Sequence, residues 1–123
     1  MATTNEQVRR RYEDGKYLND GAVENTDTDS PANGADTVVT EDTDVHIVDT
    51  DGTNTVDLSN IEAAGRTVRI VHNGGANTPT VTFDAADFVG SAPGDLTSAG
   101  ATVTVQNING NADGWVEVST GSA

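Results

Sequence analysis

Residues 66–83, RTVRIVHNGGANTPTVTF, carry the clearest secondary-structure signal in the chain. Valine and isoleucine alternate with polar residues before Gly74 and Gly75, and the alternation returns after them in the segment TVTF. A period of two is typical of β-strands that bury one face. Because tight turns favour glycine and asparagine, two such strands around the glycine pair predict a β-hairpin. A lone hairpin is not stable in water, so further strands must pack beside it.

The same alternation recurs along most of the chain. We expect strands at 37–40, 44–49, 54–59, 66–73, 80–84, 101–107 and 114–119. Short strands separated by glycine- and asparagine-rich turns predict a mainly β chain, folded as an antiparallel β-sandwich or jelly-roll-like domain over residues 37–123. Residues 23–36 are polar and contain proline and glycine, which is typical of a linker. No repeat of fixed length is evident.

Residues 1–22 differ from the rest of the chain in charge. They carry four basic and four acidic residues, whereas residues 23–123 carry two basic and sixteen acidic residues. Capping-box patterns at the N-terminus predict a short helical or extended arm, and a helix of about ten residues is only marginally stable without a surface to dock on. The alternative is a frayed, solvated tail. The side chains expected to anchor the arm on an acidic neighbour are Val8, Arg9, Arg10, Arg11, Tyr12 and Tyr17.

The apolar content predicts a thin core. Hydrophobic residues make up 34% of the chain and aromatic residues 4%. Strands with many valines and few large side chains favour a core that is shared between copies, as in obligate oligomers. We expect a homotrimer, with a pentamer as the alternative. The residues expected in the oligomer core are Val68, Ile70, Val81, Phe83, Val103, Val105 and Trp115.

The net charge of −14 restricts the environment and the partners of the protein. Such a surface repels nucleic acid and repels itself in dilute salt. At molar salt the Debye length falls to about 3 Å, which removes most of that repulsion. Many aspartates with a single lysine are typical of proteins from extreme halophiles, and an ordinary acidic surface protein is the alternative. The chain has no cysteine and no apolar run that could cross a membrane, and we expect no signal peptide because no hydrophobic segment follows Met1.

Few residues suggest a chemical site, and we expect neither an enzyme nor a cofactor or metal ion. His46 and His72 fall inside predicted strands, where a structural histidine is the simpler interpretation. The segment from Asp49 to Asn54 is similar to a calcium loop, but Ile47 and Leu58 occupy the positions where the first and last carboxylates are needed. A turn between strands is the better interpretation, although an ion near Asp49 and Asp51 stays open.

The order of strands, glycines and the single tryptophan over residues 37–119 resembles the small β-domain of fibre, spike and decoration proteins of tailed viruses. The matching segments are Thr55-Val56-x-Leu58, Gly65-Arg66-Thr67-Val68-x-Ile70-x-x-Asn73-Gly74-Gly75, Val81-x-Phe83, Gly90, Gly100-x-x-Val103-x-Val105 and Gly114-Trp115-Val116-x-Val118. In that group a strand pair surrounds an Asn-Gly-rich turn, and a tryptophan-bearing strand closes the domain. The resemblance implies a homotrimer, and with the acidic composition it implies a virus of a halophilic archaeon.

The resemblance implies a structural virion protein. We expect a capsid decoration protein or head fibre on the virion surface, assembled in the host cytoplasm and attached to the major capsid protein or another virion protein. A chain of this length, without a triple-helical shaft or a β-helix repeat, favours a separate attached component over a long fibre. A tail, baseplate or vertex-turret component is one alternative, and a receptor- or glycan-binding module is another.

Overall fold

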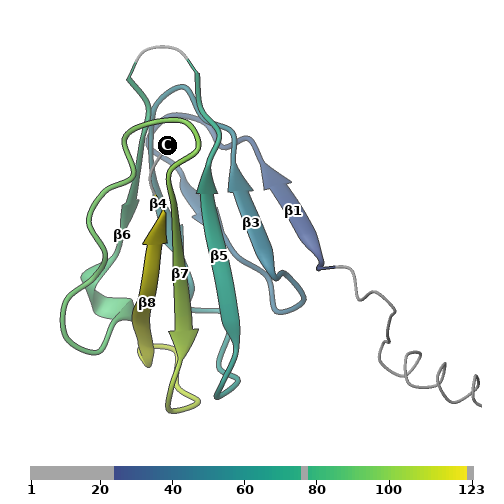
Figure 1. The fold of residues 1–123 in the computed structure, drawn as a ribbon, viewed down its shortest axis with the longest axis vertical. Helices are drawn as coiled ribbons and strands as arrows, with labels where there is room; N and C mark the ends of the chain where they lie inside the picture. The colour runs from purple at the N-terminus through teal and green to yellow at the C-terminus, as the bar shows by residue number, and fades with distance from the viewer. Residues whose placement is uncertain (1–23, 76–77, 122–123) are drawn as a thin grey trace, which may run out of the picture.

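The structure is a computed structural model that describes residues 24–75 and 78–121. Figure 1 shows these residues as a β-body, the name used below for this part of the chain. The expectation of a mainly β chain with two sheets is confirmed. Its elements are β1 (Thr26–Asp29), β2 (Asp36–Val38), β3 (Val45–Val48), β4 (Thr53–Asp57), β5 (Thr67–His72), β6 (Thr80–Phe83), the 3-10 helix η1 (Ala85–Asp87), β7 (Thr102–Asn107) and β8 (Trp115–Gly121).

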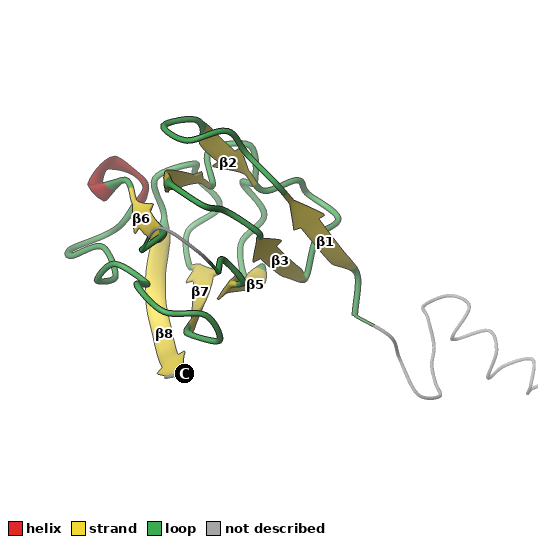
Figure 2. Cartoon of the chain, turned by 90° about the horizontal axis from the view of Figure 1, so that it is seen from above, coloured by secondary structure: helices red, strands yellow, loops and turns green. Residues whose placement is uncertain are grey.

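The first six strands alternate between the two sheets. One sheet has the order β1-β3-β5-β7-β8 and the other has the order β2-β4-β6. The chain therefore winds as a coil in which each turn adds one strand to each sheet, and the interior lies between the two sheets (Figure 2). Only β7 and β8 leave this pattern, because both join the sheet that contains β5.

Winding of this kind makes neighbouring strands parallel. The pairs β1–β3, β3–β5, β2–β4 and β4–β6 are all parallel, and only β5–β7 and β7–β8 are antiparallel. The prediction of an antiparallel, jelly-roll-like domain is therefore wrong for the first six strands, since a jelly roll is built from antiparallel pairs. The turns of the coil differ in length: Thr26 pairs with Val45, 19 residues later, and Val45 pairs with Arg69, 24 residues later. Unequal turns explain why the sequence shows no fixed repeat.

The predicted hairpin around Gly74 and Gly75 is also wrong, because β5 and β6 belong to different sheets. The segment between them crosses from one sheet to the other. The buried side chain of His72 holds its two ends: His72 Nδ1 accepts the N–H of Gly74 at 3.1 Å, and His72 Nε2 lies 3.0 Å from the carbonyl oxygen of Pro79. A neutral ring with its hydrogen on Nε2 satisfies both contacts.

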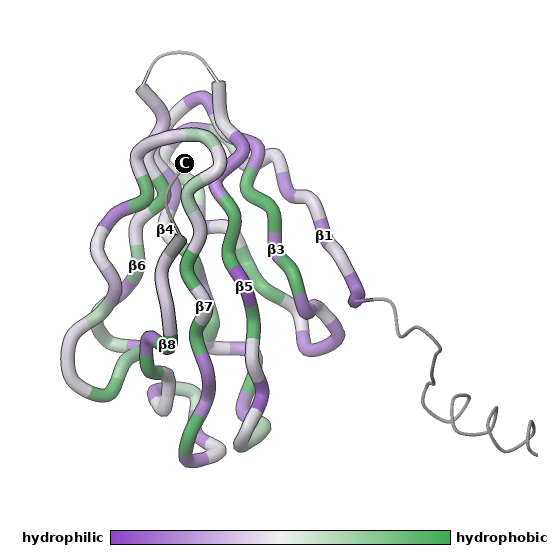
Figure 3. Tube along the Cα trace, in the orientation of Figure 1, coloured by the Kyte–Doolittle hydropathy of each residue, from purple (hydrophilic) through white to green (hydrophobic). Residues whose placement is uncertain are grey.

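Strand β1 lies inside the segment that was expected to be a linker. Its four residues, TDTD, pair in register with β3 along their whole length. Residues Thr26–Asp29 thus belong to the folded body. This strand has no apolar alternation because the side chains of Asp27 and Asp29, which share a face with His46 and Val48, point into the body and are polar. Figure 3 shows β1 without the apolar positions that mark β3, β5 and β7.

Valine makes up half of the core cluster between the sheets. Inward positions alternate with outward ones in β5 and β7, as predicted from the period of two. Phe88 from η1's C-terminal end and Leu96 from the following loop close one side, and Phe83 packs edge-on against Phe88 with ring centroids 6.2 Å apart. The cluster comprises Val39, Val48, Val56, Leu58, Ile61, Val68, Ile70, Val81, Phe88, Leu96, Ala101, Val103, Val105 and Trp115.

Candidate functional site

The residues expected in a shared oligomer core lie inside a single chain. Six of the seven are completely buried in it: Val68, Ile70, Val81, Val103, Val105 and Trp115. The seventh, Phe83, packs against the same cluster. The sequence-based argument that several copies must meet to bury these side chains therefore fails, because strands of the same chain cover them. Any contact between copies has to use other residues.

The residues expected to anchor the arm lie outside the described part of the chain. They are Val8, Arg9, Arg10, Arg11, Tyr12 and Tyr17. Their role stays a prediction.

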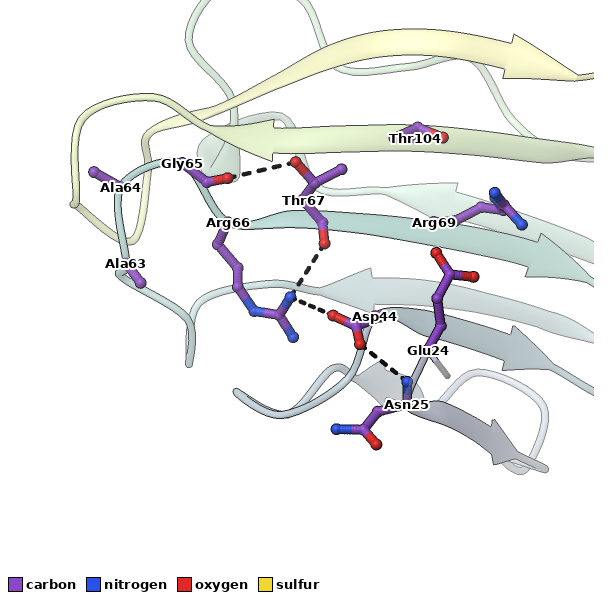
Figure 4. Close-up of a pocket in the computed structure, with 10 residues that line it drawn as sticks. All are labelled: Glu24, Asn25, Asp44, Ala63, Ala64, Gly65, Arg66, Thr67, Arg69 and Thr104. Atoms are coloured by element: carbon purple, nitrogen blue, oxygen red, sulfur yellow. Dashed lines mark hydrogen bonds and ion pairs between the residues drawn. The ribbon is translucent and has the colours of Figure 1, made fainter. Parts of the chain in front are cut away.

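The most distinctive surface feature of the β-body is a groove at one end of the five-stranded sheet, which we call the arginine groove (Figure 4). Its volume is about 790 Å³. It contains Arg66 and Arg69, the two basic residues of the chain beyond residue 22. The lining residues are Glu24, Asn25, Asp44, Ala63, Ala64, Gly65, Arg66, Thr67, Arg69 and Thr104.

Arg66 has a structural role in this groove. Its guanidinium donates to the carboxylate of Asp44 at 2.8 Å, to the carbonyl oxygen of Glu41 at 3.1 Å and to the carbonyl oxygen of Thr43. It thereby fixes the turn before β3 against the start of β5. Burial raises the pKa of Asp44, but the N–H of Asn25 and the charge of Arg66 outweigh it and hold that pKa below its usual value. Asp44 is thus a stable counter-ion for Arg66.

Arg69 is different, because its exposed guanidinium makes no hydrogen bond or ion pair with the described residues. Its side chain projects from the outer face of β5, with Thr104 of β7 also lining the groove (Figure 4). The carboxylate of Glu24 lies on the same side without pairing to it. A free guanidinium next to hydroxyl groups can form two parallel hydrogen bonds to a carboxylate or sulfate. Glu24 and Asp44 reduce the net positive charge that such a ligand would meet.

A second polar cluster lies inside the body where β1, β2 and β3 meet. His46 is completely buried, with Nε2 2.7 Å from the hydroxyl of Thr37 and Nδ1 3.2 Å from the carboxylate of Asp27. The hydroxyl of Thr37 donates to Asp29 at 2.7 Å. The order carboxylate, imidazole, hydroxyl has the connectivity of a hydrolytic triad. Thr37 is 0% exposed, however, so its oxygen cannot reach a substrate, and the cluster serves to hold the three strands together.

The hydrogen bonds of this cluster can be assigned by counting protons. If Thr37 donates to Asp29, His46 must donate from Nε2 to Thr37, and a neutral ring then has no proton on Nδ1 for Asp27. In this neutral form Nδ1 and the carboxylate of Asp27 would both be acceptors at 3.2 Å, so only a ring protonated on both nitrogens makes all three contacts hydrogen bonds. Burial lowers the pKa of His46, and the charges of Asp27 and Asp29 oppose this effect without reversing it. Burial thus favours the neutral ring, and the two carboxylates favour the protonated one.

Carboxylates elsewhere do not assemble into a metal site. Within residues 24–75 and 78–121, no group of three or more histidine, cysteine, aspartate or glutamate side chains is arranged to hold a metal ion. Asp49 and Asp51 line a separate hollow of about 480 Å³, together with Asn33 and Gly52.

At the end of β4, the buried carboxylate of Asp87 accepts the N–H of Leu58 at 3.4 Å. Burial raises the pKa of Asp87, and the charges of neighbouring aspartates raise it further.

Sequence reasoning missed both polar clusters. The signal for the arginine groove was present, because the two arginines of the body stand three residues apart in an otherwise acidic region. The signal for the buried cluster was weaker: the TDTD segment has the period of a strand but none of its usual apolar residues.

Within the described residues, no helix has the length and apolar character needed to cross a membrane. No protein-family model matches the chain, and no curated protein matches it either.

Proposed function

We propose that this protein is a structural component of a virion, a capsid decoration protein or head fibre that works in concentrated salt. The observation that carries the proposal is the separation of charge along the chain. The β-body has sixteen acidic residues and two arginines, and one of the arginines is neutralised by Asp44, whereas residues 1–22 hold the other four basic residues. A protein that attaches by one end and faces brine with the other needs such a division.

The position of β1 supports this arrangement. It is an edge strand of the five-stranded sheet, so the described part of the chain begins at the periphery of the body (Figure 1). The segment before β1 has no net charge, but its basic residues include the run Arg9-Arg10-Arg11, which in this proposal reaches an acidic capsid surface. In this proposal Arg9, Arg10 and Arg11 form ion pairs with the major capsid protein or another virion protein. Tyr12 and Tyr17 add apolar contact.

The resemblance to viral decoration domains adds a homotrimer to the proposal, with a pentamer as its alternative at a capsid vertex. A tail, baseplate or turret position would use the same division of charge. In each case the protein lies on the virion surface after assembly in the host cytoplasm.

Particle binding tests the proposal. Purified full chain should bind tailed virus particles from a high-salt host, and electron microscopy should place it at regular positions on the shell. Removal of residues 1–22 should abolish binding while the circular dichroism of the β-body stays unchanged. The matched charge variant is the triple change of Arg9, Arg10 and Arg11 to alanine, with Arg69→Ala as the control for loss of a cation elsewhere. Truncated protein that decorates particles at normal occupancy would refute the anchoring role.

A second candidate function is a receptor- or glycan-binding module, and the arginine groove favours it. The free guanidinium of Arg69, beside the hydroxyls of Thr67 and Thr104, suits a sugar that carries a carboxylate or sulfate. A glycan array probed at molar salt would reveal such binding. Arg69→Gln should abolish it, whereas equal binding by wild type and variant would exclude the groove.

A further inference from the structure

The two sheets have four edge strands, and three of them are protected against pairing with another chain. Exposed edges invite strand addition, and proteins prevent it with short strands, inward charges or covering loops. Strand β1 has four residues, and Asp27 and Asp29 point inward. Strand β2 has three residues. Strand β6 is covered by the loop at Leu96, whose N–H and carbonyl both bond to Val81, at 2.8 and 2.9 Å.

The fourth edge, that of β8, lacks such protection over most of its length. This strand has seven residues, and only its start is covered, where Trp115 accepts the N–H of Val89 at 2.8 Å. Within the described residues, no strand pairs with the outer edge of β8. Residues 117–120 are all exposed, and Figure 2 shows this end of β8 projecting from the body.

Exposed apolar side chains gather around the same strand. Among the described residues the large exposed hydrophobic side chains are Val38, Val89, Ile108 and Val118. Val118 lies in β8 and is 55% exposed, while Val89 and Ile108 donate their N–H groups to Trp115 and Gly114. A β-bulge makes Val118 an extra residue, because Glu117 and Ser119 on either side of it pair with two consecutive residues of β7. A bulge can twist an edge away, but this one adds an exposed apolar side chain rather than a charge.

The charge distribution indicates which partner fits this edge. The last 28 residues of the chain contain two acidic residues, Asp113 and Glu117, out of twenty in the whole chain. The uncovered part of β8, residues 116–121, carries one acidic residue, Glu117, so the strand itself adds little repulsion between two copies, while Asp84 and Asp87 lie near its covered start.

We propose that a second copy of this chain pairs with β8, antiparallel and about a two-fold axis at Ser119. This axis places Val118 opposite Thr120 of the other copy, a pair of β-branched side chains of the kind that stabilises sheets. It places Glu117 opposite glycine 121, so that the two carboxylates do not oppose each other. The two five-stranded sheets then form one continuous sheet, and the pairing is closed at two copies. This two-copy pairing does not rest on the virion role, but it replaces the homotrimer of the proposed function, and the mass of the protein in solution distinguishes the two.

Light scattering in molar sodium chloride tests the proposal first. The full chain should have twice the mass of one chain, and Val118→Lys should give the mass of one chain with unchanged circular dichroism. The expected weakening is about tenfold or more in dissociation constant, from the loss of one buried valine side chain. Val38→Lys is the matched control, because Val38 is 39% exposed on β2 of the other sheet, and it should leave the pair intact. A wild-type monomer or trimer, or a pair that survives Val118→Lys, would overturn the proposal.

Cross-linking tests the register, since the chain has no cysteine of its own. Directly opposed residues of an antiparallel pair have Cα atoms about 4.5–5.5 Å apart, within the range of a disulfide. Ser119→Cys should therefore form a covalent dimer under mild oxidation. Glu117→Cys and Val38→Cys should not, because neither residue faces its own copy. Equal cross-linking of all three variants, or none with Ser119→Cys, would contradict the two-fold pairing.

Discussion

Replacing each of the two adjacent glycines by alanine distinguishes the crossing between sheets from the hairpin that the sequence suggested. In a two-residue hairpin turn with Gly74 and Gly75 at its centre, at least one of them would need a positive φ. In the structure neither is among the residues with positive φ, so the two differ only in the space around them. A Cβ on Gly74 would overlap the carbonyl oxygen of Thr50 and lie 2.7 Å from Cγ of Pro79. A Cβ on Gly75 would meet no atom within 4 Å.

The magnitudes follow from these contacts. Gly74→Ala forces a backbone carbonyl and a proline ring to move, and overpacking of this kind costs about 1–3 kcal/mol. Gly75→Ala meets no obstacle and reduces the entropy of the unfolded chain, which stabilises a protein by about 0.4–1 kcal/mol. The two variants should therefore differ by about 1.4–4 kcal/mol in free energy of unfolding. At about 4–8 °C per kcal/mol for a small domain, that difference corresponds to roughly 6–30 °C in melting temperature.

Chemical denaturation measures the difference in free energy of unfolding between the two variants. Molar sodium chloride is used because it screens the repulsion between the surface carboxylates. We expect Gly75→Ala to unfold at or above the wild-type midpoint and Gly74→Ala well below it, with the same slope against denaturant. Equal midpoints for the two variants would refute the crossing geometry. Destabilisation by Gly75→Ala alone would favour a turn that requires a positive φ at that residue.

Three further predictions concern charge. Burial and neighbouring aspartates raise the pKa of Asp87, so the folded protein loses stability as pH rises and this carboxyl group ionises. Asp87→Asn keeps an acceptor for the N–H of Leu58 and should raise the free energy of unfolding at pH 7 by about 1 kcal/mol. Urea titrations should show that this gain diminishes toward acid pH. Burial lowers the pKa of His46 below 6.5 in the folded protein. As the pH drops below about 6.5, the unfolded chain therefore binds this proton more readily than the folded one. The free energy of unfolding should fall from there until the pH reaches the lower pKa of the folded state. His46→Gln should flatten that part of the pH profile, and an unchanged profile would assign the slope to another group. Thermal melts should show a melting temperature that falls as sodium chloride is diluted from molar to tens of millimolar, and a flat response would remove the argument for a high-salt environment.

The sequence predicted local structure better than the partners of each strand. All seven predicted strands are present, because alternation reports which residues face the core. Alternation does not report whether the next strand in the chain pairs with its predecessor or crosses to another sheet. Gly74 illustrates the ambiguity, since glycine serves a tight turn and a close approach to the Thr50 carbonyl equally well. A local pattern therefore led to antiparallel neighbours where the chain forms parallel ones.

The polar interior escaped prediction for a related reason. Asp27 and Asp29 look solvated in the sequence, and their inward direction depends on Thr37 and His46, which come from two other strands. The arginine groove likewise joins segments far apart in the sequence: the start of the body, Asp44 before β3, the turn before β5, and Thr104 of β7. Residue types suggested what each segment could do, but the winding of the chain decided which segments meet.

The distribution of acidic residues links these features. Aspartates on β1 and in the loops near β3 protect the first end of the coil. Without them the edge strands β1 and β2 could pair with strands of another chain. The same residues oppose any contact with a like-charged copy at that end. Strands β7 and β8 end the coil with antiparallel pairing, and this region has few acidic residues. Repulsion at the other surfaces therefore directs association between copies to β8 as much as attraction at β8 does. Added salt should strengthen this pairing only until the repulsion between the two acidic bodies is screened.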